Sequence, residues 1–392
     1  MTDQHQKSSR TWFERNPKKT IALVLFVFLL AVTYGAEKLL AYINHTHNLV
    51  IFTDRRYINL REIPPNVDTV DVPTDLAVRT SDGLVQKPYR VRTDANGFML
   101  PYNHYAKPDL KLLFLGGSTV ACIYVDEDQR YPYLVGQLLQ EKTGKKITSI
   151  NAGVGGNNSL HSLDVLLNKI IPLKPDVVVM MHNINDLVTL IYDKTYWGNN
   201  PSRQPIIDFY FYKNLTGLKA LSTLARDMYI PNLHASIRIL SHKIFGRKVK
   251  VQDDEFANVR GKKLTIDEAA IINEFKMNLQ TFINICRAWH ITPVLMTQFN
   301  RYKRHPDPKV LAAMQGFQSD SGIPVSEFID LYARFNQAIR DVGKQNGVLV
   351  IDLANQIPQD KKYIYDVVHL NTRGSQLAAR VISRRLLPLV PQ

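Results

Sequence analysis

The chain has 392 residues, and 45% of them are hydrophobic, which is enough for a sizeable core and argues against disorder. The net charge of +14 is spread along the chain without a nucleic-acid-binding motif, so we expect no nucleic acid partner and favour an anionic surface such as lipid headgroups. The two cysteines, Cys122 and Cys286, have no metal-site spacing and cannot build a disulfide-based domain, although a bond between them stays open.

An apolar segment near the N-terminus predicts a membrane-spanning helix. Residues 21–36 are almost continuously apolar, and the flanking residues extend the candidate signal anchor to residues 20–43, long enough for a span. Five basic residues lie within residues 1–19, and this positive flank keeps that tail in the cytoplasm. We therefore expect a single-pass membrane protein whose main domain is extracytoplasmic, and periplasmic in a bacterium. A cleaved signal peptide is the alternative, although no clear small-x-small site follows.

Residues 44–108 are rich in prolines and polar residues and show little periodicity, so they predict a tether that packs along the domain. The alternation over Tyr89–Thr93 suits a strand, and Asn96-Gly97 suits a tight turn. We therefore expect an N-terminal hairpin here, and a structural role is the simpler interpretation of it.

From residue 109 to residue 392 the chain alternates strands and helices. We expect strands over Lys111–Leu115, Ile147–Ile150, Asp176–Met181, Pro293–Thr297 and Val348–Asp352. We expect helices over Asp126–Lys142, Leu160–Ile171, Ile266–Trp289, Val325–Asn346 and Thr372–Leu387. This alternation predicts an α/β fold with a parallel sheet and helices on both of its faces.

An insertion, residues 196–263, lies between the third and fourth predicted strands and is far longer than a plain crossover. It contains a predicted amphipathic helix over Leu218–Met228, a second apolar stretch around Ile237–Phe245, and a basic tract that begins at Arg247. Because insertions after strand carboxyl ends lie over the active site, we expect a lid or acyl-binding cap that could touch lipid. A decorative subdomain with a solvated basic face is the alternative.

Polar residues follow four of the predicted strands, at the edge where open α/β folds keep their ligand sites. They are Ser118; Asn151 and Gly156; His182, Asn183, Asn185 and Asp186; and Asp366 and His369. A serine needs a base within hydrogen-bond reach, a histidine can be that base, and a carboxylate can fix its tautomer. Taken alone, Ser118 also fits a helix N-cap without chemistry, and only these partners favour a catalytic role.

Four segments resemble the four blocks of the SGNH (GDSL-type) hydrolases in order and spacing: LFLGGSTV, NAGVGGNNS, HNINDL and DVVHLNTRG. The resemblance covers about Leu110 to Leu387, the insertion apart. It implies a flavodoxin-like three-layer α/β/α sandwich with a central parallel sheet, and ester hydrolysis or acyl transfer without a metal or other cofactor. The chain departs from the GDSL form at Gly117, where the aspartate is missing, and at Asn183, where glycine is usual. Many membrane-tethered relatives look like this chain in having GGST after the strand.

The resemblance also implies a role for each matched residue. Ser118 stands at the nucleophile, His369 at its base and Asp366 at the carboxylate that orients the base. The oxyanion hole would consist of the Ser118 N–H, the Gly156 N–H and the Asn185 side-chain amide. Hydrogen-bond donors of these types suit a developing oxyanion.

The expected function is therefore a membrane-anchored serine esterase that cleaves an ester of a lipid or an acylated glycan through an acyl-Ser118 intermediate. An O-acetyltransferase or deacetylase acting on cell-envelope polysaccharide is one alternative, and product analysis with a sugar acceptor would separate transfer from hydrolysis. A catalytically silent, membrane-tethered module that binds carbohydrate or lipid is another. Labelling of Ser118 by a fluorophosphonate would exclude the silent module.

Overall fold

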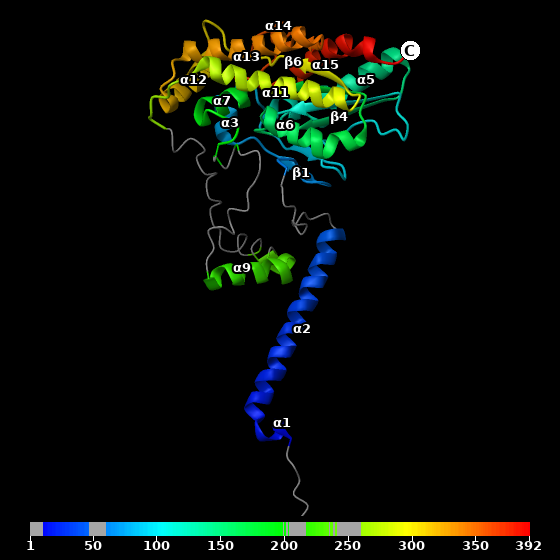
Figure 1. Ribbon diagram of the computed structural model, residues 1–392, viewed down its shortest axis with the longest axis vertical. Coiled ribbons are helices and arrows are strands. Elements are labelled where there is room, and N and C mark those ends of the chain that lie inside the picture. Colours follow the sequence, from blue (N-terminus) through cyan, green and yellow to red (C-terminus); the bar gives the residue numbers. More distant parts are fainter. Residues whose placement is uncertain are drawn as a thin grey trace, which may run out of the picture. The chain divides into compact units, whose positions relative to one another are not determined.

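A computed structural model describes residues 11–46, 60–198, 200, 203, 217–234, 236, 237, 240 and 260–392 (Figure 1). The chain forms two compact units. We call residues 1–56 with 209–250 the anchor unit, and residues 57–208 with 251–392 the sheet unit. Each unit is described by itself.

The anchor unit contains α1 (Trp12–Arg15), α2 (Pro17–Thr46) and α9 (Gly217–Tyr229). Pro17 begins α2, a position where the missing N–H of proline costs no helical hydrogen bond. Within α2, Pro17–Ile43 is long and apolar enough to cross a membrane, and a signal sequence would have the same properties. The helix that the apolar segment predicted is therefore present.

The sheet unit is built on five parallel strands in the order β4-β3-β5-β6-β7. Their bounds are β3 (Leu110–Gly116), β4 (Ile147–Gly153), β5 (Val177–Met181), β6 (Thr292–Met296) and β7 (Leu349–Ile351). Counted along the chain, this order is 2-1-3-4-5, that of flavodoxin-like folds. All five strands lie where the sequence predicted them, within a few residues at their ends.

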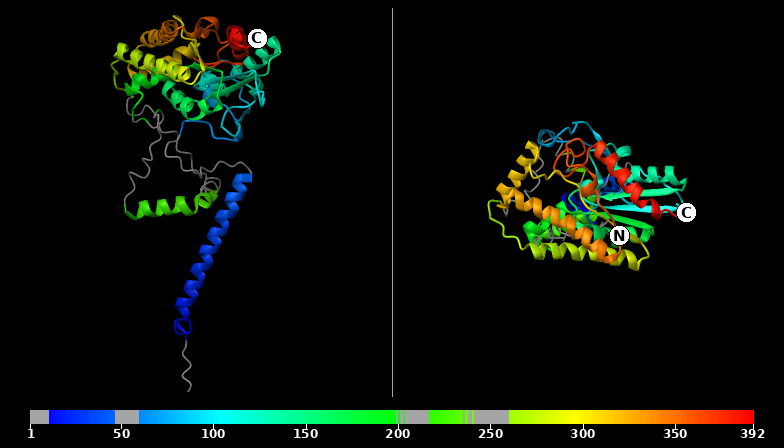
Figure 2. Two further views of the ribbon diagram at one scale, coloured as in Figure 1. Left: turned by 45° about the vertical axis from the view of Figure 1, so that its right-hand side comes forward. Right: turned by 90° about the horizontal axis from the view of Figure 1, so that it is seen from above.

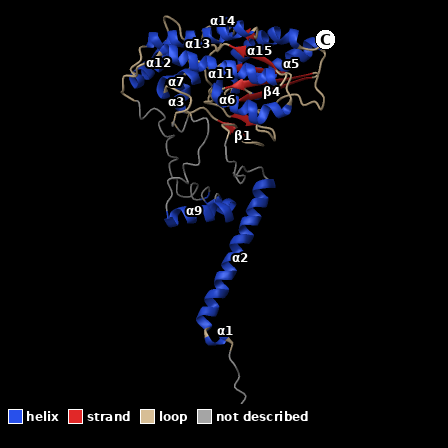
Figure 3. Cartoon of the chain, viewed as in Figure 1, coloured by secondary structure: helices blue, strands red, loops and turns tan. Residues whose placement is uncertain are grey.

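Helices cover both faces of this sheet, as Figures 2 and 3 show. One face carries α6 (Ser159–Val165), α7 (Ile184–Asp193), α11 (Glu268–Ala288), α12 (Pro308–Ser321) and α13 (Val325–Asn346). The other face carries α5 (Tyr131–Thr143), α14 (Leu353–Gln356) and α15 (Thr372–Leu386). The three-layer α/β/α sandwich that the sequence predicted is therefore correct.

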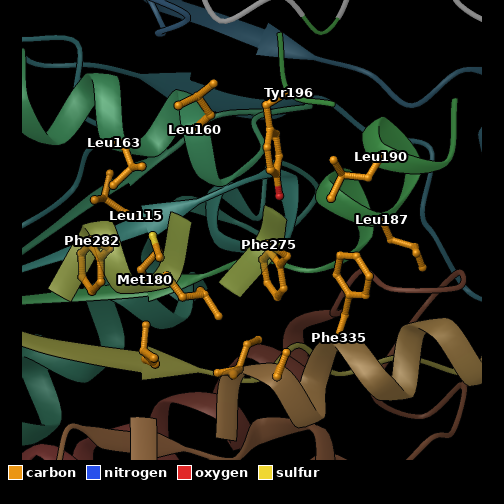
Figure 4. Packing of buried hydrophobic residues seen from close by; sticks show 14 of the residues in the cluster. Leu115, Leu160, Leu163, Met180, Leu187, Leu190, Tyr196, Phe275, Phe282 and Phe335 are labelled. Atoms are coloured by element: carbon orange, nitrogen blue, oxygen red, sulfur yellow. The ribbon is translucent and has the colours of Figure 1, made fainter. Parts of the chain in front are cut away.

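Side chains of successive strand residues enter two separate cores. Leu113 and Leu115 of β3 pack with the first group of helices, whereas Leu112 and Phe114 pack with the second. Figure 4 shows the first core, where Leu115 and Met180 face aromatic side chains of α11 and α13. This alternation, the period of two of a strand, makes each strand apolar on both faces and explains the continuous apolar runs.

Two predicted helices are divided in the structure. The helix expected over Asp126–Lys142 is a short 3-10 turn, Glu127–Gln129, followed by α5, whose first turn contains Pro132. The helix expected over Leu160–Ile171 becomes α6, a π-helical turn and a 3-10 turn that contains Pro172. Proline lacks the N–H that a continuous helix needs, which accounts for both divisions.

The N-terminal part of the sheet unit pairs differently from the expected hairpin. β2 (Tyr89–Arg92) is a strand as predicted, but its antiparallel partner is the earlier β1 (Asp68–Asp71). The turn at Asn96-Gly97 is present, with Gly97 at φ +74° and a bridge between Thr93 and Met99 closing it. Between the two strands lies α3 (Asp75–Thr80).

The structure also contains a helix that was not predicted, and the same structure bears on the expectations for the cysteines and the insertion. The helix α12 carries only a weak apolar stripe and was not predicted. Cys122 and Cys286 are separate, buried free thiols. Most of residues 196–263 lie outside the described residues, and so does most of the apolar stretch around Ile237–Phe245. The predicted amphipathic helix is present as α9 of the anchor unit.

Candidate active site

Two glycines end β3 and turn the chain into α4 (Ser118–Ala121). A β-carbon on Gly116 would lie 2.3 Å from Cγ2 of Val120 and 2.6 Å from the carbonyl oxygen of Met181. No side chain fits at this position, so the strand can pass directly into the first turn of the helix. The turn places Ser118 at the carboxyl edge of the sheet, as the sequence predicted.

The loop before α15 brings a histidine and a carboxylate to this serine. His369 Nε2 lies 2.8 Å from Ser118 Oγ, and His369 Nδ1 lies 2.6 Å from Asp366 Oδ2. The other carboxylate oxygen, Oδ1, accepts the backbone N–H groups of Val368 and His369 at 2.8 and 2.7 Å. Asp366 is thus held by its own loop, and it fixes the orientation of the imidazole ring.

The charges of this pair shift the pKa of both groups. Burial alone would lower the pKa of His369, but the negative charge and hydrogen bond of Asp366 outweigh it and raise the pKa above 6.5. Burial alone would raise the pKa of Asp366, but His369 and the two backbone donors outweigh it and lower the pKa below 3.8. Asp366 is therefore ionised at neutral pH, and His369 can take up a proton from its neighbour.

Two of the predicted oxyanion-hole residues, Gly156 and Asn185, come from neighbouring segments next to the turn that carries Ser118. Asn185, in the first turn of α7, donates its side-chain N–H to the carbonyl oxygen of Asn157 at 2.8 Å. That bond ties α7 to the loop after β4, in which Gly156 adopts φ +76°. The amide nitrogen of Asn185 also lies beside Gly117, directly before the serine.

Two arginines that the sequence did not single out lie against the same residues. The guanidinium of Arg61 covers Gly156, where a β-carbon would be 2.6 Å from its Nη2. Arg203 Nη1 donates to the carbonyl oxygen of Gly156 and to Asn185 Oδ1, both at 3.4 Å. No local pattern could have revealed them, because both lie outside the four motif blocks.

A pocket of about 250 Å³ opens beside Ser118 and His369. Its walls are mostly apolar: Ala77 and Leu84 from the N-terminal segment, Cys122, Ile123 and Tyr124 after α4, and Tyr365 and Leu370 beside the histidine. The ring of Tyr365 stacks on that of His369, with centroids 5.7 Å apart. A segment that the sequence predicted as a tether therefore supplies one wall of the pocket.

The buried side chain of Arg301 joins that wall to the loop that carries Asp366 and His369. Its Nη2 donates to Asp82 at 2.8 Å and to Asp307 at 2.6 Å. Its Nη1 donates to the carbonyl oxygens of three consecutive loop residues, 364 to 366, at 3.3 to 3.4 Å. This guanidinium therefore connects three segments in the interior, and no sequence pattern predicted it.

The remaining polar residues of the predicted loops have structural partners. Asn151 donates to the carbonyl oxygen of Val120, behind the serine. Asn183 donates to the carbonyl oxygen of Tyr332, and His182 and Asp186 belong to a buried network beneath α7. In the described ranges, no three His, Cys, Asp or Glu side chains gather in a way that could hold a metal ion.

Residues 114–377 match the GDSL-like Lipase/Acylhydrolase family. Among solved structures, the acetylxylan esterase Axe2 from Geobacillus stearothermophilus is similar, with 17% identity and a TM-score of 0.41 over 71% of this chain and 94% of that chain. So is LAE5, an alpha/beta hydrolase enzyme from the metagenome of Lake Arreo, Spain, with 14% identity and a TM-score of 0.40 over 74% of this chain and 100% of that chain. Comparison with curated protein sequences gives no match. The family match runs through all four motif blocks and most of the sheet unit, and the protein therefore belongs to the GDSL-like lipase/acylhydrolase family and is an ester hydrolase.

Proposed function

We propose that the protein is a membrane-anchored serine esterase that cleaves its substrate through an acyl-Ser118 intermediate. One observation carries this proposal: the continuous hydrogen-bonded series from Asp366 through His369 to Ser118, at 2.6 and 2.8 Å, opens onto a pocket. A serine hydroxyl is a weak nucleophile near neutral pH, and a histidine oriented by a carboxylate is the arrangement that activates it.

In the first half of the reaction, Ser118 Oγ attacks the ester carbonyl while His369 Nε2 takes the hydroxyl proton. The tetrahedral intermediate collapses, the alkoxy group leaves, and His369 returns the proton to it as the alcohol departs. In the second half, a water molecule gives a proton to His369 and attacks the acyl-enzyme. The carboxylic acid is released and the proton returns to Ser118 Oγ.

The oxyanion of each tetrahedral intermediate needs donors that are already in place. We assign this role to the N–H groups of Ser118 and Gly156 and to the side-chain amide of Asn185. One N–H of that amide is held by the carbonyl oxygen of Asn157. Because a primary amide carries two N–H groups, the second one is left to donate to the oxyanion.

The pocket favours an ester with a small group beside the serine. Its volume of about 250 Å³ lies below the ~300–1,000 Å³ of pockets that enclose a drug-sized ligand. Its apolar walls suit a short acyl group or one face of a sugar ring. We take acylated glycans and short-chain lipid esters as the substrate class, and water as the acyl acceptor.

The helix α2 supports the proposed anchoring. Its apolar stretch follows five basic residues, which favours a cytoplasmic N-terminus and an extracytoplasmic sheet unit, periplasmic in a bacterium. Retention of the chain in membranes after alkaline carbonate extraction, together with protease protection of the tail in sealed cells, would test this topology.

The test of the mechanism uses two serines that each have a histidine partner. Ser118→Ala should lower kcat/KM for p-nitrophenyl acetate by at least ~10³-fold and abolish labelling by a fluorophosphonate. The control is Ser162→Ala, because Ser162 Oγ lies 2.7 Å from Nε2 of His182 in the buried interior. That variant should keep its activity and its labelling. Full activity in Ser118→Ala, or labelling that persists in it, would refute Ser118 as the nucleophile. The catalytically silent binding module would then be the better interpretation.

A further inference from the structure

We propose that α9 lies flat in the lipid headgroup region beside the span of α2, with its apolar face among the acyl chains. This inference rests on the proposed membrane span and extends it to a second element of the anchor unit. It gives α9, from the segment that the sequence predicted as a lid, a different role, contact with lipid.

The apolar face of α9 is exposed. Leu218, Leu221, Leu224 and Met228 recur every three or four residues, so they share one side of the helix. Their side chains are all exposed, Leu218 to 85%, and Tyr229 at the end of the helix is 73% exposed. In water, a helix at the surface of a folded unit turns such a face inward.

Two polar side chains of this segment are buried instead. Thr223, on the side of α9 opposite Leu221, is buried, and so is Asn232 just beyond the helix. Exposed leucines beside a buried threonine suit a helix whose outer face is covered by lipid, where polar side chains turn away from the acyl chains. The exposed apolar side chains of α2 in the same unit, from Ile21 to Tyr34, show the same pattern.

A buried carboxylate fixes this segment to one end of the span. Glu37 follows the apolar run of residues 21–36 directly, and only 6% of it is exposed. Its Oε1 accepts the backbone N–H of Asn232 at 3.1 Å and the side-chain N–H at 2.7 Å, and its Oε2 accepts the backbone N–H of Leu233 at 2.7 Å. Residues 231–234 form the first helical turn after α9, where a carboxylate satisfies N–H groups that have no partner within the helix.

The position of Glu37 sets the depth of α9. A charged residue at the end of an apolar run lies at the boundary between acyl chains and headgroups. The segment that Glu37 holds must therefore lie near that boundary, and α9 ends only three residues before Asn232. The exposed face of α9 and the surface of α2 then meet one bilayer.

Lipid suits this face better than a second copy of the chain does. The apolar surface of α2 is already committed to lipid by the proposed span, and the face of α9 adjoins it in the same unit. The sequence after this segment carries the basic residues Arg247, Lys248 and Lys250, which suit anionic headgroups.

The experiment places an environment-sensitive fluorophore on α9 in the full chain, reconstituted into vesicles of phosphatidylcholine and phosphatidylglycerol. Leu221→Cys tests the apolar face, and Arg226→Cys, about 140° around the helix from Leu221, is the control. Cys122 and Cys286 are buried, so a thiol reagent reaches the added cysteine first. Vesicles with brominated acyl chains quench only a fluorophore that lies among those chains.

We expect a blue-shifted label at 221 that loses most of its fluorescence in brominated vesicles, and a label at 226 that loses little. Adding Glu37→Ala should reduce the quenching at 221 while the chain stays in the membrane. A label at 221 that reports water would overturn the inference. A blue-shifted but unquenched label would also overturn it, because protein rather than lipid would then cover the face.

Two controls separate this inference from the proposed function. A chain that alkaline carbonate extracts would overturn the membrane span and this inference together, whereas a retained chain with an unquenched label overturns this inference alone. Hydrolysis of soluble p-nitrophenyl acetate by the labelled protein reports the esterase independently of both.

Discussion

The side-chain nitrogen of Asn185 lies 2.5 Å from the position that a β-carbon on Gly117 would occupy. The carbonyl oxygen of Asn157 is 3.0 Å from the same position and accepts the N–H of that amide. In this chain, a side chain at position 117 would therefore press on the Asn185 amide unless that amide moved.

Gly117→Ala should consequently reduce catalysis without unfolding the protein. The new methyl group displaces the Asn185 amide, and loss of one oxyanion donor costs roughly 10²–10³-fold in kcat. Gly155→Ala is the control, since a β-carbon there meets no atom within 4 Å. Steady-state kinetics with p-nitrophenyl acetate measure both variants. Equal activity of the two would show that the amide does not serve the oxyanion.

The pKa shifts of His369 and Asp366 predict how the esterase activity depends on pH. His369 must be neutral to accept the proton of Ser118, and its pKa lies above 6.5 because of Asp366. The kcat/KM for a neutral ester should therefore rise with pH and level off only above that pKa. Asp366→Asn removes the negative charge that favours the imidazolium, so the rising limb should move to lower pH while the plateau falls by at least ~10²-fold. If the rising limb of the kcat/KM profile stays at the same pH in Asp366→Asn, a group other than His369 controls that limb.

Arg301 should act on both stability and catalysis. Arg301→Met leaves two carboxylates and three carbonyl oxygens without their donor, and we expect a loss of ~1–3 kcal/mol, since Asp82 and Asp307 are partly exposed and can be solvated. Because the loop that carries Asp366 loosens, kcat should fall by roughly tenfold or more. Chemical denaturation measures the loss of unfolding free energy, and steady-state kinetics measure the fall in kcat.

Arg340→Met provides the comparison for Arg301. Arg340 pairs with Asp352, and both side chains are about as exposed as those of a surface pair, at 27% and 30%. Its removal should cost ~1 kcal/mol or less and leave kcat unchanged. Similar kinetic losses in both variants would contradict a positioning role for Arg301.

The parts of this fold that sequence predicts are those in which local pattern and tertiary packing agree. The strands are apolar on both faces because each touches two cores, and α13 has the bounds that its periodicity predicted. Ser118, Asp366 and His369 could be identified because each lies next to a strand end or in a compact loop. Pairing partners of the short edge strands were not predictable, since β1 carries no apolar alternation.

The contacts that the sequence could not reveal come from side chains that act at long range. Arg301 is buried and binds residues more than sixty positions away on both sides of it in sequence, and nothing in its neighbourhood distinguishes it from a surface arginine. The pocket wall that Ala77 and Leu84 provide also depends on long-range contacts. A proline-rich segment without periodicity obtains its structure from the domain on which it packs. Such contacts follow from the fold and leave no local pattern.

A second serine, histidine and aspartate lie close together beneath α7. His182 Nε2 is 2.7 Å from Ser162 Oγ, and His182 Nδ1 is 3.5 Å from Asp186 Oδ2. All three are buried, and none lines the pocket. Burial lowers the pKa of His182 to about 3 and raises the pKa of Asp186 to about 6, so this histidine is neutral and cannot be the partner of an ionised carboxylate in the way His369 is.

This difference predicts that replacing aspartate by asparagine has different effects at positions 186 and 366. Asp186→Asn should raise stability and keep activity, whereas Asp366→Asn should lower activity. Between pH 4 and 6 the folded protein keeps the proton of Asp186 that the unfolded chain has already lost, since burial raises its pKa from 3.8 to about 6. The folded state thus binds more protons there, so its stability falls as pH rises through this window, by up to about 3 kcal/mol.

Asp186→Asn does not titrate, and the variant should gain stability relative to wild type between pH 5 and pH 8. It should also keep most of its esterase activity, whereas Asp366→Asn loses it. Thermal unfolding at the two pH values, with ester hydrolysis on the same samples, measures both effects. An Asp186→Asn protein with the stability profile of wild type would show that Asp186 is ionised in the folded state across this range.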